Sequence, residues 1–378
     1  MDITKQVQPW QRVGEVARIF LVLGFTAFGG PAVHIAMMRE QCVKRRAWLD
    51  DARFADLIGI VNLIPGPSST ELGLYIGYLR AGWLGLLTAG VCFIGPALLI
   101  VLAIAWAYVT FGTLPAAGAL VHGITPVIIA VIAQALYGLG RTILRGVVPV
   151  VATLAVVTLY LLGANPIVLL FGMGLLGGGV IFAQRARQRL PAALGLPLLL
   201  AKAAPVATNL VLFLTFLKIG SVTYGSGYVL LAFLRDDLVT HLHWITDRQL
   251  LDAISVGQFT PGPVFTTATF LGYLIGGFPG AFIATLGIFM PAFIFVPLIH
   301  PLASRIRKHP LTAALLDSVN AAALGLMAGV LMQLGRDTFT GIIPIAVSII
   351  ALVLLIRFRV NSVWLILAGA ALGFVLHR

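Results

Sequence analysis

Long apolar segments separated by short loops run through most of this chain. Hydrophobic runs lie near 82–111, 116–140, 147–162 and 166–183, and again near 278–300, 311–335, 339–356 and 360–376. A spanning helix needs about 20 apolar residues to cross a hydrocarbon core of roughly 30 Å. Only 10% of the 378 residues are charged, against roughly 25% in a soluble protein. The sequence therefore predicts an all-α polytopic membrane protein.

The chain is also a tandem repeat. Residues 20–70 align with residues 216–266 at an offset of 196, with 16 identities in 51 positions. With one residue deleted, the same register continues through most of both halves. We therefore predict an N-terminal repeat at 1–190, a linker at 191–205 and a C-terminal repeat at 206–378.

The charges in the loops indicate that the second half is inverted relative to the first. Short loops rich in Lys and Arg remain in the cytoplasm. Loop 39–53 carries five such residues, whereas its counterpart 235–248 carries three aspartates and two arginines. Five crossings in each half, an odd number, would turn the second half upside down. We expect an inverted-topology repeat with about ten crossings plus re-entrant broken helices, a recurring plan of secondary transporters.

Two pairs of elements interrupt the apolar stretches with glycine, proline and small polar residues. The first pair is Gly24–Pro31 and Gly220–Gly227, and the second places Pro-Gly-Pro at 65–67 and 261–263. A half-helix restarting after proline presents free N–H groups and the positive end of its dipole, which binds anions. Non-helical backbone at membrane depth is tolerated only against protein or a water-filled cavity. We therefore expect a polar cavity between the halves.

The candidate binding residues belong to these breaks. In the first half they are Phe28, Gly29, Gly30, Pro31, Asn62, Pro65, Gly66, Pro67, Ser68, Ser69 and Thr70. In the second half they are Lys218, Tyr224, Gly225, Ser226, Gly227, Gln258, Pro261, Gly262, Pro263 and Thr266. Lys218 is an ionisable residue in a predicted apolar element, which marks a functional position. Arg39 and Arg235 are candidates for gating, and Glu71 is a candidate for binding a coupling proton.

These residues also have structural interpretations. Glycine-rich breaks suit close packing between membrane helices. Arg39 and Arg235 can extend to the membrane interface and pair there with Glu40 and Asp236. Glu71 is equally suited to an ion pair or to a helix terminus.

Several functional classes do not fit the sequence. The net charge of +12 comes from short clusters between apolar stretches, which indicates membrane topology and not nucleic-acid binding. The two cysteines have neither a CxxC nor a Cys/His cluster around them, so we expect no disulfide framework and no metal site. HExxH, GxSxG and P-loop motifs are absent from the sequence, so we expect no enzyme and no cofactor. The expected partners are the lipid bilayer and a small ligand, with a homodimer as a further candidate.

The break residues resemble those of the chromate ion transporter family. The resemblance rests on Phe-Gly-Gly-Pro at 28–31, Trp48-Leu49, Pro-Gly-Pro at 65–67 and the diverged copy at 218–227. It spans nearly the whole chain and matches the two-domain, long-chain form, whose short-chain relatives are single halves that work as pairs. The resemblance implies an inner-membrane exporter of chromate that confers chromate resistance. Chromate and sulfate share charge and shape, so a transporter of sulfate or another oxyanion is the alternative.

Overall fold

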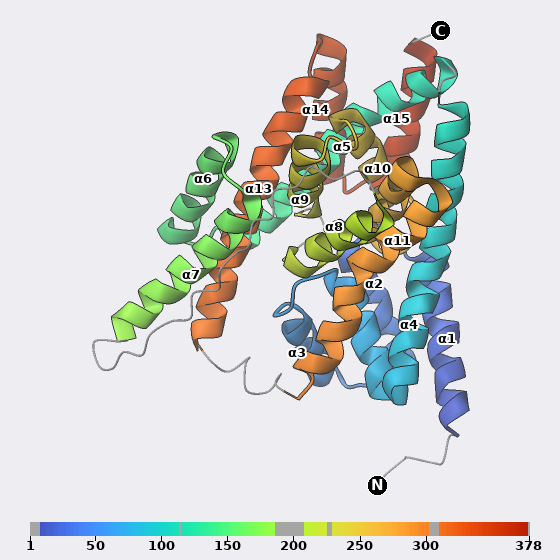
Figure 1. Ribbon diagram of the computed structural model, residues 1–378, viewed down its shortest axis with the longest axis vertical. Helices are drawn as coiled ribbons and strands as arrows, with labels where there is room; N and C mark the ends of the chain where they lie inside the picture. The colour runs from blue at the N-terminus through green and yellow to red at the C-terminus, as the bar shows by residue number, and fades with distance from the viewer. Residues whose placement is uncertain (1–7, 113–114, 186–207, 225–228, 302–309, 377–378) are drawn as a thin grey trace.

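The computed structural model describes residues 8–112, 115–185, 208–224, 229–301 and 310–376, and the regular elements in these ranges are all helices (Figure 1). The first half contains α1 (Pro9–Thr26), α2 (Pro31–Arg39), η1 (Glu40–Arg45), α3 (Asp51–Val61), α4 (Ser68–Phe111), α5 (Pro115–Ile143), α6 (Val147–Leu161) and α7 (Pro166–Arg185). The second contains α8 (Asn209–Val222), α9 (Leu230–Leu234), η3 (Arg235–His241), α10 (Asp247–Phe259), η4 (Val264–Thr266), α11 (Thr267–Ile299), α13 (Pro310–Thr338), α14 (Ile342–Arg357) and α15 (Ser362–Leu376). The two halves therefore repeat the same order of elements. The predicted linker lies outside the described residues.

Equivalent local signals start equivalent helices in the two halves. Asp50 caps α3 by accepting a hydrogen bond from the Arg53 backbone N–H, and Thr246, at the matching position, caps α10 by accepting from Gln249. Short polar side chains at this position satisfy the free N–H groups of a first helical turn. The duplication thus extends to the capping chemistry.

The chain reverses direction inside α4 and inside α11. Gly82 and Gly277 both have φ of 62°, a left-handed conformation that only glycine adopts readily. A Cβ atom on Gly77 would meet the carbonyl of Gly85, although residues eight apart in a straight helix are separated by about 12 Å. Each element therefore consists of a short arm before the turn and a long helix after it.

The two long helices run antiparallel at the centre of the molecule. In Figure 1 α4 rises from the lower part of the molecule to the upper right, whereas α11 descends from the upper right to the bottom. Gly90 of α4 lies against the ring of Phe293 near the far end of α11. Small residues allow membrane helices to approach closely, which is the main source of packing energy between them.

The last helices of each half pack on the other half. The Thr153 hydroxyl of α6 donates to the carbonyl of Ala321 in α13, at 3.0 Å. At the equivalent place the Ser348 hydroxyl of α14 donates to the carbonyl of Pro126 in α5, at 2.7 Å. Helix α7 packs on α13 and α15 packs on α5 in the same way. The halves are therefore interlocked by an exchange of helices.

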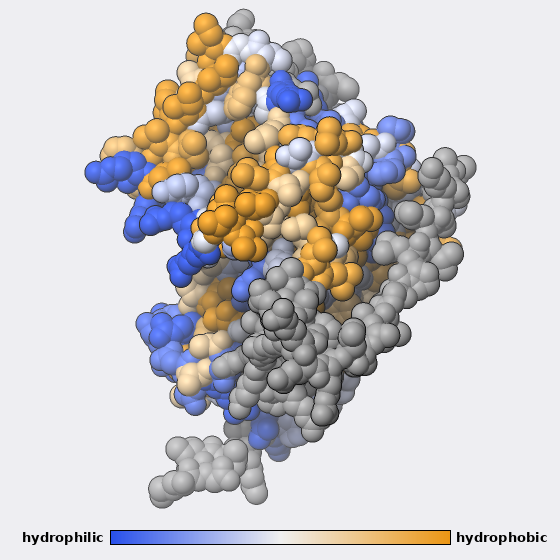
Figure 2. All heavy atoms as spheres, turned by 90° about the vertical axis from the view of Figure 1, so that its left-hand side faces the viewer, coloured by the Kyte–Doolittle hydropathy of each residue, from blue (hydrophilic) through white to orange (hydrophobic). Residues whose placement is uncertain are grey.

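The outer surface is suited to lipid. Within the described ranges, the segments Ser68–Phe111, Gly123–Ile143, Val264–Ile299 and Leu315–Arg336 are long and apolar enough to cross a membrane, and five shorter apolar helices accompany them. Figure 2 shows hydrophobic side chains over much of one outer face. Val148 and Ile342, at the starts of α6 and α14, are 79% and 85% exposed. The structure confirms the predicted all-α fold, and its long apolar helices are consistent with a multi-pass membrane protein.

The exchange predicts that a bulky residue at the α5–α15 contact destabilises the protein. A Cβ atom on Gly123 would meet the backbone of Gly369 and Gly373, and backbone cannot move aside as a flexible side chain can. We expect Gly123→Leu to lower the free energy of unfolding by at least 1–3 kcal/mol, the usual cost of overpacking. Thermal unfolding in detergent measures the change.

The matched control is Gly172→Leu in α7, because a Cβ atom there meets nothing within 4 Å. Equal melting temperatures for the two variants would show that the close contact does not contribute to stability.

Candidate functional site

The two Pro-Gly-Pro breaks dock on the breaks of the opposite halves. The backbone N–H of Gly66 donates to the carbonyl of Thr223, at 2.7 Å, and the N–H of Gly262 donates to the carbonyl of Ala27, at 3.0 Å. Thr223 and Ala27 follow α8 and α1 directly, so each bond joins a proline break to the glycine-rich break of the other half. The four interrupted elements therefore meet at one place in the interior.

Glycine is required at these junctions. Gly66 and Gly262 have φ of 140° and 91°, which L-residues with side chains rarely adopt. A Cβ atom at Gly66 would also meet the carboxyl of Glu71, and one at Gly262 would meet Ala97. Because these two N–H groups are already bonded between the halves, the donors left for a ligand are other backbone N–H groups and the side chains nearby.

His34 strengthens the junction on one side only. Its Nε2 lies 3.1 Å from the carbonyl of Ala27, and its Nδ1 lies 3.1 Å from the hydroxyl of Ser69. A carbonyl only accepts hydrogen bonds, so Nε2 carries the hydrogen and Nδ1 accepts from Ser69. The neutral ring thus ties α2 to the first turn of α4. Leu230 stands at the equivalent position of the second half, where no such bond can form.

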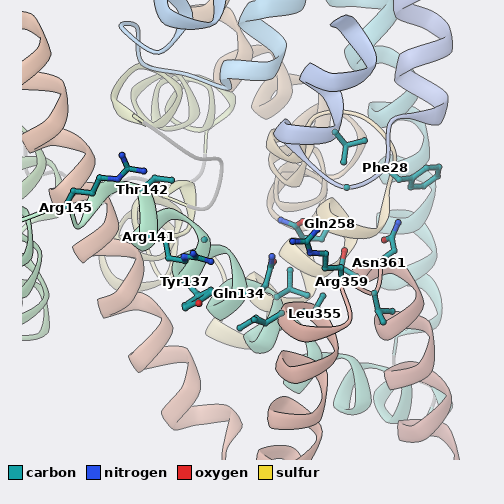
Figure 3. Close-up of a pocket in the computed structure, with 17 residues that line it drawn as sticks. Phe28, Gln134, Tyr137, Arg141, Thr142, Arg145, Gln258, Leu355, Arg359 and Asn361 are labelled. Atoms are coloured by element: carbon teal, nitrogen blue, oxygen red, sulfur yellow. The ribbon is translucent and has the colours of Figure 1, made fainter. Parts of the chain in front are cut away.

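A large basic cavity opens beside the junction (Figure 3). It has a volume of about 810 Å³ and is lined on one side by Phe28 and Gly29 of the first break and by Gln258, which precedes the second Pro-Gly-Pro. The other walls carry the polar and charged residues Gln134, Tyr137, Arg141, Thr142 and Arg145 from α5 and its end, and Arg359, Asn361 and Ser362 from the turn between α14 and α15. The residues that line the cavity include three arginines and no acid.

The arginines keep their charge available to a ligand. Neither Arg141 nor Arg145 nor Arg359 forms an ion pair with a carboxylate in the described part of the chain. Arg141 lies over the ring of Tyr137, with its guanidinium carbon 5.9 Å from the ring centroid. Guanidinium groups match the geometry of oxyanions and bind them with charge-assisted hydrogen bonds. The cavity therefore favours anions with several oxygen atoms.

A second, smaller cavity lies next to the first, because Thr142 lines both. Its volume is about 310 Å³, and its polar lining residues are Asn62, Ser68, Thr142 and Asn320. Pro31 and Ser68, the first residues of α2 and α4, both reach this cavity. Two helix N-termini therefore open into it. Their free N–H groups and aligned dipoles favour negative charge.

The predicted site residues thus fall into several environments. Phe28, Gly29 and Gln258 line the large cavity, while Pro31, Asn62 and Ser68 line the small one. Gly30 caps α2, and the hydroxyl of Thr266 donates to the carbonyl of Pro263. Thr70 is buried in the first turn of α4, between the proline break and Glu71. Pro65, Pro67 and Pro261 flank the bonded glycines, Tyr224 packs on Phe171, and Gly225, Ser226 and Gly227 lie outside the described residues.

The three cations predicted from the sequence are paired with aspartates and line neither cavity. Arg39 pairs with Asp51 and Arg235 with Asp247, at equivalent places in the two halves and each at 2.7 Å. These partners replace the Glu40 and Asp236 suggested by the sequence. Lys218 forms its ion pair with Asp237.

The segment around Lys218 gathers other charges as well. Burial raises the pKa of the neighbouring Asp236 to about 6, and the positive charge of His241 acts in the opposite direction. Asp236, Asp237 and His241 lie close enough together to hold a cation, but Asp237 already binds Lys218 and His241 bonds the Asp236 backbone. The group therefore acts as a local network of charges that holds η3 to α8.

The arginines that line the cavity are not among the site residues predicted from the sequence. Arg141, Arg145 and Arg359 lie in short basic loops, which were interpreted only as signals of membrane topology. One signal was present: Gly140-Arg141 recurs in the second half as Gly335-Arg336. The distance along the chain between α5 and the turn after α14 concealed the fact that both face one cavity.

The fold and this site define a class of protein. A multi-pass helical chain with two repeated halves, broken helices that meet inside it and an adjoining basic cavity has the architecture of a membrane transporter with a site suited to small anions.

Comparison with known proteins identifies the family. The chromate transporter family profile matches residues 14–178 and again residues 210–374, one copy in each half. The chain belongs to the chromate transporter family, in the long form that carries both copies on one polypeptide. As the sequence predicted, it is a transporter-family protein and not an enzyme.

Named relatives resemble the chain over nearly its full length. A chromate transport protein of Cupriavidus metallidurans is 32% identical over 96% of this chain and 93% of its own length. A probable chromate transport protein of Synechococcus elongatus is 32% identical over 93% of this chain and 92% of its own. A chromate transport protein of Pseudomonas aeruginosa is 30% identical over 98% and 94%. No solved structure shows significant similarity to the chain.

Proposed function

We propose that this protein exports chromate across the cytoplasmic inner membrane and thereby confers chromate resistance. The observation that carries the proposal is the basic cavity, whose three arginines lie beside the broken helices and face no acidic residue in its lining. The names of the Cupriavidus and Pseudomonas relatives support chromate as the substrate. A divalent, tetrahedral oxyanion suits a site built from guanidinium groups, hydroxyls and helix N-termini.

The two cavities suggest a path for the anion. Arginines in the large cavity raise the local concentration of anions and replace part of their hydration shell. The small cavity then offers the N-termini of α2 and α4, the hydroxyl of Ser68 and the carboxamides of Asn62 and Asn320. An oxyanion leaving water needs such donors, because an unpaired charge in an apolar interior is very costly.

Alternating access is the mechanism that the architecture favours. We propose that the halves form an inverted-topology repeat with about ten membrane crossings. We also propose that the halves rock about the junction where the four interrupted elements meet. The antiparallel course of α4 and α11 supports inversion. The hydrogen bonds from Gly66 to Thr223 and from Gly262 to Ala27 keep the broken backbone paired at the pivot.

The inversion predicts that equivalent residues face opposite sides of the membrane. Lys44 and Thr240 are 196 positions apart, and both are exposed. In a background with Cys42 and Cys92 replaced, Lys44→Cys should react with a membrane-impermeant thiol reagent from the cytoplasmic side. Thr240→Cys should react from the opposite side. Labelling of both from one side would contradict the inverted arrangement.

Everted membrane vesicles test the substrate. We expect vesicles that contain the protein to accumulate labelled chromate, because export from the cell becomes uptake in this geometry. Vesicles without the protein provide the background, and sulfate measured in parallel tests the alternative. Strong sulfate uptake without chromate uptake would favour a sulfate transporter, and no uptake of either would refute oxyanion export.

The basic cavity predicts different roles for two nearby arginines. Arg359 lines the cavity, whereas Arg357, two residues earlier, is exposed and does not line it. Loss of one charge-assisted hydrogen-bond donor costs about 1.5–3 kcal/mol, so Arg359→Gln should raise the KM for chromate roughly ten- to a hundredfold. Arg357→Gln removes an equal charge from the same turn and should leave KM within about twofold. Equal effects of both variants would indicate only a general effect of surface charge.

A further inference from the structure

One buried carboxyl remains unexplained by the oxyanion path. Glu71 lies in the first turn of α4, directly after the first Pro-Gly-Pro, and is fully buried. Neither of its carboxyl oxygens has a hydrogen-bond partner among the described residues, and no described Lys or Arg forms an ion pair with it. An ionised carboxylate without partners is very unfavourable in an apolar interior. The group is therefore neutral in this conformation and carries a proton.

The fold itself does not require an acid at this place. Thr267 occupies the matching position after the second Pro-Gly-Pro, and its hydroxyl donates to the carbonyl of Val264. Thr266, which matches Thr70, is satisfied in the same way by Pro263. The second half thus fills the equivalent turn with neutral, fully bonded side chains. The acid is one of the differences between the two turns, in which Ser68 and Ser69 also correspond to Val264 and Phe265.

The carboxyl lies close to the proposed anion path. Ser68, three residues earlier on α4, lines the small cavity, and three residues correspond to about 4.5 Å along a helix axis. The carboxyl also lies against Gly66, whose N–H bonds the other half. Ionisation of Glu71 therefore changes the electrostatic potential both at an anion in the cavity and at the junction between the halves.

Other titratable groups lie on the elements around α4. They include His34 of α2, Asp56 of α3, Tyr75 of α4, Tyr224 after α8, Asp252 of α10 and His300 at the end of α11. Tyr224 is within electrostatic reach of the carboxyl. His34 forms hydrogen bonds with Ala27 and Ser69, and Asp252 accepts a hydrogen bond from Tyr108. In contrast to these six groups, Glu71 has both carboxyl oxygens buried without a hydrogen-bond partner among the described residues.

We propose that Glu71 is a proton-binding site that couples a proton to the transported oxyanion, an inference that rests on the proposed function. A dianion in the small cavity repels an ionised carboxylate in the same helical turn, so anion and proton bind together. When the cavity opens to the other side, water reaches the carboxyl and the proton leaves with the anion. One proton and one dianion carry one net negative charge, so an inside-negative potential still favours export.

Proton movement in proteoliposomes tests the proposal. The full chain is reconstituted with a pH-sensitive dye inside, the membrane potential is clamped, and chromate or sulfate is added in mildly alkaline buffer, where both are dianions. We expect the lumen to acidify as the anion enters, with about one proton for each oxyanion. Glu71→Gln, which keeps the shape of a protonated carboxyl, should still exchange internal for external anion but should lose the acidification.

Two further variants provide controls. Glu40→Gln neutralises an exposed glutamate that pairs with Lys44 and Arg45, and it should acidify the lumen as the unmodified protein does. Glu71→Thr copies the residue of the second half and should behave as Glu71→Gln does. Should both Glu71 variants fail to fold, acidification of the lumen by the unmodified protein still decides whether a proton moves with the oxyanion.

The outcomes separate this inference from the proposed function. Oxyanion entry by the unmodified protein without acidification would overturn the role of Glu71 while leaving oxyanion transport intact. Acidification by Glu71→Gln equal to that of the unmodified protein would overturn it as well. Movement of neither oxyanion by the unmodified protein would refute the proposed function and the inference together.

Discussion

The structure depends on the need to pair every backbone polar group that lies away from water. Four interrupted elements inside a membrane protein would leave N–H and C=O groups unpaired, each at a cost of several kcal/mol. The bonds from Gly66 to Thr223 and from Gly262 to Ala27 solve this problem across the repeat, since each half supplies the donor that the other half lacks. Neither break is complete without the other. The halves are thus bound to each other where the chain is least regular.

The structural features of this junction are repeated in the two halves, whereas some ionisable residues near it occur in one half only. The capping residues, the turns at Gly82 and Gly277 and the Arg–Asp pairs are repeated almost position by position. Other positions are not repeated, and among them are His34, Glu71 and Lys218, which correspond to Leu230, Thr267 and Val22 in the other half. Each places an ionisable side chain in only one half. A duplicated fold can in this way contain an asymmetric binding site, because the two halves contribute chemically different residues to it.

Much of the fold could be read from the sequence, because membrane helices and internal repeats leave strong local signals. The apolar segments gave the all-helical, multi-pass class, and the Gly and Pro clusters marked the breaks. The pairing of side chains was harder to predict. Lys218 was expected to face a ligand but binds Asp237, and Arg141 and Arg359 were interpreted as topology signals but line one cavity. Arg141 and Arg359 are more than two hundred residues apart in the chain, and no local pattern encodes that both line one cavity.

The exchange of terminal helices also bears on how the protein is made. Helix α5 packs on α14 and α15, which are synthesised long after it, and α6 and α7 pack on α13. The first half therefore enters the bilayer before the surfaces that cover it exist. Its apolar faces must rest against lipid or against the insertion machinery until synthesis ends. Assembly of the two halves is thus a late event, completed only after translation has delivered α15.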